Sequence, residues 1–196
     1  MDNKKNPIKL FGGLAIMRKT TKEMVEYQER FKDKIDPAVR ARNFRFLGSQ
    51  ADVLHQYAQS EKFYRQGLSF FEPLERIDQR YQSLEFNGFL SYSLLRQHKN
   101  GWFELMEKTL LDFDKSMDGE WLKSNDYYTW AVWKSGIEIR NSDALLDTRK
   151  SKNQYREHID NWLNDADLIL RMPDGKNDGF VRRRRELAEV VEKFQS

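Results

Sequence analysis

Four consecutive arginines, residues 182–185, form the most concentrated run of like charge in this chain. They lie within the stretch DGFVRRRRELAEVVEKF, residues 178–194. Guanidinium groups bind phosphate and carboxylate oxygens through paired hydrogen bonds, so such a run is typical of a nucleic-acid contact or of an acidic partner. Consecutive residues of a helix, however, point about 100° apart, so these four side chains would surround a helix axis rather than form one patch.

The same stretch has the apolar period of an amphipathic helix. Large apolar side chains recur every seven residues, at Phe180, Leu187 and Phe194. Arg184 falls on this seam, and we expect it to face an acidic neighbour, either the acidic middle of the chain or a second subunit. Arg182 and Glu186 are spaced as an i,i+4 ion pair, which leaves Arg183 as the least neutralised of the four. Arg183 and Arg184 are therefore candidate partner-binding residues on a C-terminal amphipathic helix, residues 180–196.

The histidines and the acidic stretches of the chain give no signature of catalysis or of metal binding. The three histidines, His55, His98 and His158, lack the HExxH spacing of zinc proteases. Two acidic stretches, 112–120 and 174–179, place lysine or arginine where a calcium loop needs a carboxylate. With no cysteine, thiol catalysis and disulfides are excluded. We expect no enzymatic activity, no metal and no cofactor.

Two aromatic-rich stretches have a structural and a functional interpretation each. Trp121, Trp130 and Trp133 crowd one region, which favours a helix buried in the core over a partner-binding surface. In RARNFRF, residues 40–46, arginines alternate with phenylalanines, as they do in some proteins that stack on nucleic-acid bases. On a helix, however, Arg42 and Arg45 share a face while Phe44 turns toward the core, so a charged flank of an amphipathic helix is the favoured interpretation.

The elements that position these residues are helices. Apolar residues recur at intervals of three and four over most of the chain, which predicts an all-α fold. Thr20 and Glu23 have capping-box spacing, Asp36-Pro37 marks a helix boundary, and Ser60 is a candidate cap for a later helix. The apolar run 10–17 is expected to be a buried strand or an anchoring segment. The polar residues 141–153 predict a loop with at most a short helical turn.

A faint internal repeat indicates stacked antiparallel helical hairpins. FLGSQADVLHQ from Phe46 aligns with FLSYSLLRQHK from Phe89, an offset of 43 residues that also places His55 over His98. A third pair of helices, around Trp130 and Trp162, fits when 141–153 is treated as an insertion. Each hairpin of such an array buries its apolar face on its neighbour.

The first hairpin resembles a tetratricopeptide-type repeat over residues 41–73. The matching positions are Phe44, Leu47, Gly48, Tyr64 and Gly67, with Pro73 one place late. The resemblance implies a helical array whose concave face binds a peptide or protein segment. The implied partner-binding residues are Arg42, Arg45, Ser49, Asp52 and, in the next hairpin, Tyr92. An irregular helical bundle with no groove is the alternative architecture.

Charge is distributed unevenly along the 196 residues. Residues 1–45 hold 12 Lys/Arg against 6 Asp/Glu, residues 46–170 hold 15 against 20, and residues 171–196 hold 7 against 5. We therefore divide the chain into a basic N-terminal segment (1–19), a helical-hairpin domain (20–171) and the C-terminal helix. No apolar run is long enough to span a membrane, and no export signal is evident, so we expect a cytoplasmic protein.

These observations favour a non-enzymatic interaction or adaptor module. Its expected ligand is a protein or peptide, and self-association into a homo-oligomer stays open. The alternative is a nucleic-acid-binding accessory protein that uses the basic ends of the chain.

Overall fold

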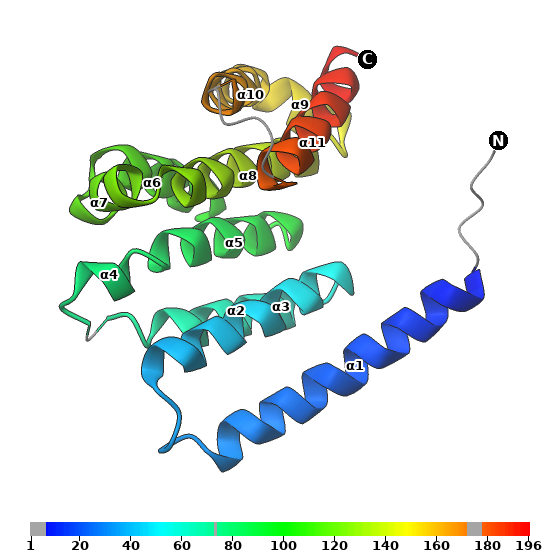
Figure 1. Ribbon diagram of the computed structural model, residues 1–196. Helices are drawn as coiled ribbons and strands as arrows, with labels where there is room; N and C mark the ends of the chain where they lie inside the picture. The colour runs from blue at the N-terminus through cyan, green and yellow to red at the C-terminus, as the bar shows by residue number, and fades with distance from the viewer. Residues whose placement is uncertain (1–6, 73, 172–177) are drawn as a thin grey trace. The chain divides into compact units, whose positions relative to one another are not determined.

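The computed structural model describes residues 7–72, 74–171 and 178–196, with only the backbone of residues 7–18 (Figure 1). The described residues form helices joined by short turns and contain no strand, so the all-α prediction is confirmed. The chain divides into two compact units, residues 1–74 and 75–196, which are treated separately below.

The first unit consists of a long helix followed by a helical hairpin. Its elements are α1 (Pro7–Arg30), α2 (Pro37–Val53) and α3 (Tyr57–Leu68). The core forms where α2 meets α3, and α1 adds the half-buried Met24 and Val25 to it. The core side chains that are fully or nearly buried are Phe44, Leu47, Ala51 and Phe63.

Helix α1 differs from the prediction in two ways. Residues 10–17, expected as a buried strand, are helical, and the helix runs unbroken through Thr20, where a new helix was predicted to begin. A short apolar run does not distinguish strand from helix, and Thr20 with Glu23 has capping-box spacing without being at a helix end. The expected boundary between residues 19 and 20 therefore lies inside one helix.

The α2–α3 hairpin is held by a small polar network and by one close approach. Asp36 caps α2 by accepting hydrogen bonds from the amides of Ala38 and Val39, as the Asp36-Pro37 pair predicted. Gly48 lets the buried ring of Tyr64 pack against the α2 backbone, because a Cβ at this position would lie 2.3 Å from Tyr64 Cε1. Gly48 and Tyr64 thus bring α2 and α3 close together in the hairpin.

Ser60 does not cap a helix, contrary to the prediction. Helix α3 begins three residues earlier, at Tyr57, and Ser60 is a buried residue inside it. Its hydroxyl donates to Asp52 Oδ1 at 2.5 Å, while the Tyr64 hydroxyl donates to Asp52 Oδ2 at 2.8 Å. Both oxygens of the Asp52 carboxylate are therefore engaged within the hairpin.

The second unit is built around one central helix. Its elements are α4 (Ile77–Arg80), α5 (Ser83–Arg96), α6 (Trp102–Lys115), α7 (Met117–Asn125), α8 (Tyr127–Leu145), α9 (Arg149–Gln154), α10 (Arg156–Leu170) and α11 (Asp178–Gln195). Helices α5 and α6 pack as a hairpin, and α8 packs with α10, as the second and third predicted helix pairs require. Helix α8 also contacts α5, α7 and α11, which explains why it is buried on several sides.

The two histidines aligned by the 43-residue offset occupy the same local structure. His55 follows α2 and His98 follows α5, and both have a left-handed backbone, with φ of 56° and 55°. The amide of Gln56 donates to the carbonyl of Ala51, and that of Lys99 donates to the carbonyl of Leu94. Both helix ends are therefore Schellman motifs with histidine in place of the usual glycine. The equivalence of these two positions supports the hairpin alignment at this point.

The segment 141–153, predicted as a loop, is largely helical. Helix α8 continues to Leu145, and Thr148 caps the short helix α9. Asn141 and Ser142 are completely buried, and the Asn141 amide donates to the Ile137 carbonyl one turn back. The prediction was wrong because it read polar residues as exposed ones, whereas Asn141 and Ser142 are buried inside the unit.

Candidate functional site

Helix α11 closes the second unit along the apolar seam predicted for it. Phe180, Leu187 and Val190 are buried against α8 and α10, and Phe194 is half-buried. Arg182 and Glu186 form the predicted i,i+4 ion pair, at 3.6 Å. The C-terminal helix is thus docked on its own unit.

Arg183 is the most buried of the four arginines, although it was expected to be the least neutralised. Its side chain is 11% exposed and pairs with Glu186. Its Nε donates to the Val132 carbonyl on α8 at 3.2 Å, and its guanidinium lies against Gly136. Burial lowers the pKa of Arg183, an effect that the charge of Glu186 opposes. The expectation failed because the side chain reaches across to α8.

Arg184 faces the neighbouring helix, as its place on the seam predicted, but it meets a backbone group there. Its Nε and one terminal nitrogen donate to the Leu170 carbonyl, at 2.8 and 2.5 Å. Leu170 is the last residue of α10, so the cation lies where the helix dipole is negative. Two of the four guanidinium groups are therefore bonded inside the unit.

A hollow of about 630 Å³ runs between α10 and α11. This is the size range of pockets that accept ligands or anchoring side chains. Its floor is apolar, formed by Leu163 and Leu187 with Val191 and Phe194 at one end. Its full lining is Asp160, Leu163, Asn164, Asp167, Arg184, Leu187, Ala188, Val191, Phe194 and Gln195. We call this hollow the α10–α11 groove.

The two walls of the α10–α11 groove differ in chemistry. The α10 wall carries Asp160, Asn164 and Asp167, which share one helix face. Asp167 pairs with Arg171, whereas Asp160 has no ion-pair partner among the described residues. The α11 wall is apolar apart from Gln195 and from Arg184, which is bonded to Leu170. The groove therefore has an acidic wall and an apolar wall.

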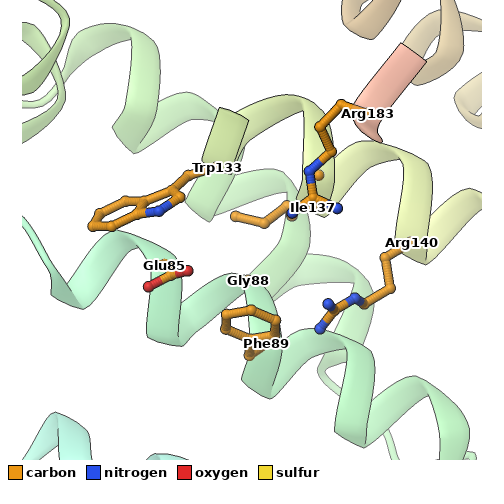
Figure 2. Close-up of a pocket in the computed structure, with 8 residues that line it drawn as sticks. Glu85, Gly88, Phe89, Trp133, Ile137, Arg140 and Arg183 are labelled. Carbon is orange, nitrogen blue, oxygen red and sulfur yellow. The ribbon is translucent and has the colours of Figure 1, made fainter. Parts of the chain in front are cut away.

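A second hollow, between α5, α8 and α11, is too small for a ligand. Figure 2 shows Arg140 reaching toward Phe89 and Arg183 toward Ile137 around it. Its volume is about 10 Å³, which is room for about one water molecule. Arg140 lies 4.3 Å from the centre of the Phe89 ring, a cation–π contact. This hollow is a packing feature of the α5–α8 contact.

A cluster of charged side chains that the sequence analysis did not predict lies inside the second unit. Lys134 on α8 is 5% exposed, and its Nζ lies 2.8 Å from Asp114 on α6 and 2.7 Å from Asp165 on α10. Burial alone would lower the pKa of Lys134, but the surrounding carboxylates hold it above its ordinary value. The lysine thus ties three helices together.

Glu138, one turn along α8, is the member of the cluster whose pKa is raised. Burial raises its pKa well above the ordinary value, and the charge of Asp165 acts in the same direction. Burial disfavours ionisation of Asp165 too, but hydrogen bonding to Glu138 and the charge of Lys134 hold its pKa below the ordinary value. A protonated Glu138 that donates to an ionised Asp165 is the arrangement these shifts describe. Lys134 and Glu138 are spaced four residues apart on one helix face, but no sequence pattern identifies Asp114 and Asp165 as their partners.

The residues predicted for a concave face are divided between the two units. Arg42, Arg45, Ser49 and Asp52 lie on α2, and Tyr92 lies on α5. Arg42 is exposed and Arg45 is half-buried, while the Ser49 hydroxyl donates to the Phe46 carbonyl. Their role in binding stays a prediction.

The tryptophans lie largely in the interior, the interpretation that the sequence favoured. Trp130 is buried and donates through Nε1 to the Phe113 carbonyl at 2.9 Å. Trp121 and Trp133 are half-buried, and the ring of Tyr81 stacks on both, with centroid separations of 5.2 and 5.9 Å. This stack attaches the short helix α4 to α7 and α8.

No protein-family model, no curated protein and no solved structure matches this chain. Over the residues that the structure describes, no helix combines the length and apolar character that crossing a bilayer requires. Within those same residues, acidic, histidine and cysteine side chains do not gather in groups of three or more around a point where a metal ion would fit.

Proposed function

We propose that this chain is a non-enzymatic interaction module that binds a protein or peptide through its second unit. The observation that supports the proposal best is the α10–α11 groove, whose apolar floor lies between two helical walls. Grooves of this kind accept the apolar face of an amphipathic helix, with anchors spaced at i, i+3 or i+4, and i+7.

The position of the groove suits recognition because its walls are fixed. Helix α10 packs on α8, and α11 packs on both α8 and α10. Arg184 joins the two walls through the Leu170 carbonyl, and Arg183 joins α11 to α8 through the Val132 carbonyl. A groove that exists before binding reduces the entropy lost on association.

The proposal is tested by photocrosslinking from inside the groove. A photoreactive phenylalanine analogue replaces Ala188, an exposed residue of the groove lining, and in a control protein replaces the exposed Glu120 on α7. We expect a crosslinked product of one fixed mass from position 188 and not from position 120. A product of twice the chain mass would identify self-association. Equal labelling from both positions, or none from position 188, would contradict a binding role for the groove.

A further inference from the structure

We infer that the occupant of the α10–α11 groove is a basic amphipathic helix supplied by a protein partner. This inference rests on the proposed function and adds the chemistry of the ligand. It follows from the shape of the groove and from the charge of its two walls.

The shape of the groove determines what can fill it. A concave surface does not pair with a copy of itself, because an isologous contact requires a self-complementary patch. The occupant must therefore be convex and at least as long as the groove. On α11 the lining residues run from Arg184 to Gln195, which is roughly 18 Å of helix. A helical segment of three to four turns covers that length and presents one apolar stripe to the floor.

The charge of the walls determines the polar side of the occupant. Asp160 and Asp167 lie along the α10 wall, and Glu157 lies one turn before Asp160, outside the groove lining. Two cations near the groove are already engaged, since Arg171 pairs with Asp167 and Arg184 binds the Leu170 carbonyl. Arg156 lies over the Phe194 ring, 5.2 Å from its centre. Asp160 is the carboxylate of the groove lining that has no ion-pair partner among the described residues.

A bound helix would therefore have two different flanks. Its apolar stripe would contact Leu163, Leu187 and Val191, and one flank would lie against the apolar α11 wall at Ala188. A lysine or arginine on the other flank would reach Asp160 in a partly desolvated setting, where charge complementarity selects partners. An acidic helix would place like charges together there and be rejected.

The test uses two synthetic peptides and four forms of the full-length protein. Each fluorescein-labelled helical peptide of about 14 residues has leucine at i, i+4 and i+7. One peptide carries lysines on the flank, and the other carries glutamates at the same positions. The proteins are the native chain, Asp160→Lys, Ala188→Glu and the charge-matched control Glu120→Lys. Binding is measured by fluorescence anisotropy.

We expect the lysine peptide to bind the native chain and the glutamate peptide to bind it more weakly. Asp160→Lys should weaken the lysine peptide by about threefold to tenfold and strengthen the glutamate peptide, in line with the size of single charge contacts. Ala188→Glu should weaken both peptides, because it places a larger, charged side chain on the α11 wall where one flank of the bound helix lies. Glu120→Lys should change neither.

Each contrary outcome identifies what is wrong. Equal binding of both peptides, unaffected by Asp160→Lys, would overturn the basic occupant and leave a peptide-binding groove standing. If neither peptide binds but a partner still crosslinks to position 188, the inference that the occupant is a helix is wrong and the proposed binding function stands. The mass measured by light scattering could double as the protein concentration rises and return to the mass of one chain in Ala188→Glu. That result would show that a second copy of the chain occupies the groove. Binding of neither peptide without crosslinking would remove both the inference and the proposed function.

Discussion

The guanidinium of Arg183 lies directly on Gly136, across the contact between α11 and α8. A Cβ at Gly136 would lie 2.3 Å from the guanidinium carbon, so this packing needs a residue without a side chain. Arg183 also donates to the Val132 carbonyl and pairs with Glu186. The arginine is therefore a structural link between two helices, and its charge is balanced where it lies.

This geometry predicts that the adjacent arginines differ sharply in their effect on stability. Arg183→Met should lower the free energy of unfolding by about 1–3 kcal/mol, because a buried carbonyl loses a charged donor and Glu186 loses its partner. Arg185 is exposed, so Arg185→Met should change it by less than about 0.5 kcal/mol. All five tryptophans lie in the second unit, so urea unfolding followed by tryptophan fluorescence reports on it directly. Equal effects of the two substitutions would contradict the assignment.

Arg184 should act locally, at the last turn of α10. Arg184→Leu keeps apolar bulk in the groove lining but removes both hydrogen bonds to the Leu170 carbonyl. We expect a loss of about 1.5–3 kcal/mol, the range for hydrogen bonds that involve charged groups. Hydrogen exchange should accelerate at amides near the end of α10 more than at those of α6. Uniform acceleration across the second unit would indicate a global role instead.

Glu138 should make the native state less stable as pH rises. Burial and the charge of Asp165 raise the pKa of Glu138 in the folded state. Its contribution to stability is therefore complete below about pH 4.3, the ordinary pKa of a glutamate, and is lost as pH rises through the pKa of the folded state. Asp165 acts in the opposite sense, because its pKa is lowered in the folded state. Its contribution to stability is present above about pH 3.9, the ordinary pKa of an aspartate, and is lost as pH falls below that value.

Glu138→Gln tests the first of these two effects. The amide keeps the shape of the side chain and a donor for Asp165 but cannot ionise. The melting temperature of the variant, followed from pH 4 to 9, should decline less on the alkaline side than that of the native protein. Glu120→Gln, at an exposed position on α7, is the control and should follow the native profile. Parallel profiles for all three proteins would mean that the pKa of Glu138 does not differ between the folded and unfolded states.

The helical class and much of the pairing could be predicted from the sequence, because they depend on apolar periodicity. The seven-residue spacing of Phe180, Leu187 and Phe194 correctly predicted the buried face of α11. The hairpin partners α5 with α6 and α8 with α10 followed from the same kind of pattern. Periodicity depends on burial, and burial of apolar side chains is the dominant favourable contribution to folding.

What could not be predicted depends on contacts between distant residues. Lys134 and Glu138 read as surface residues, and only Asp114 and Asp165, contributed by other helices, make their burial tolerable. The α10–α11 groove likewise arises from the docking of two helices on one another. The sequence singled out Leu187, Arg184 and Phe194 on its α11 side, but no local pattern distinguishes Asp160 on the α10 side from other surface carboxylates.

The close approach of Gly48 and Tyr64 in the first unit gives the last prediction. Gly48→Ala should lower the stability of the α2–α3 hairpin by about 1–3 kcal/mol, the usual cost of overpacking, because the Tyr64 ring is fully buried and has no room to move. Tyr64→Leu alone should also destabilise it, since Asp52 Oδ2 loses its donor and the core loses a ring.

The double variant Gly48→Ala, Tyr64→Leu separates these causes. Once the ring is removed, the added methyl group has nothing to collide with, so the double variant should be more stable than the sum of the two single effects predicts. The first unit has no tryptophan, so the comparison is made by hydrogen exchange at the amides of α2 and α3. Additive effects would show that the methyl group and the ring do not compete for the same space. A coupling of about 1 kcal/mol or more in the compensating direction is the expected result.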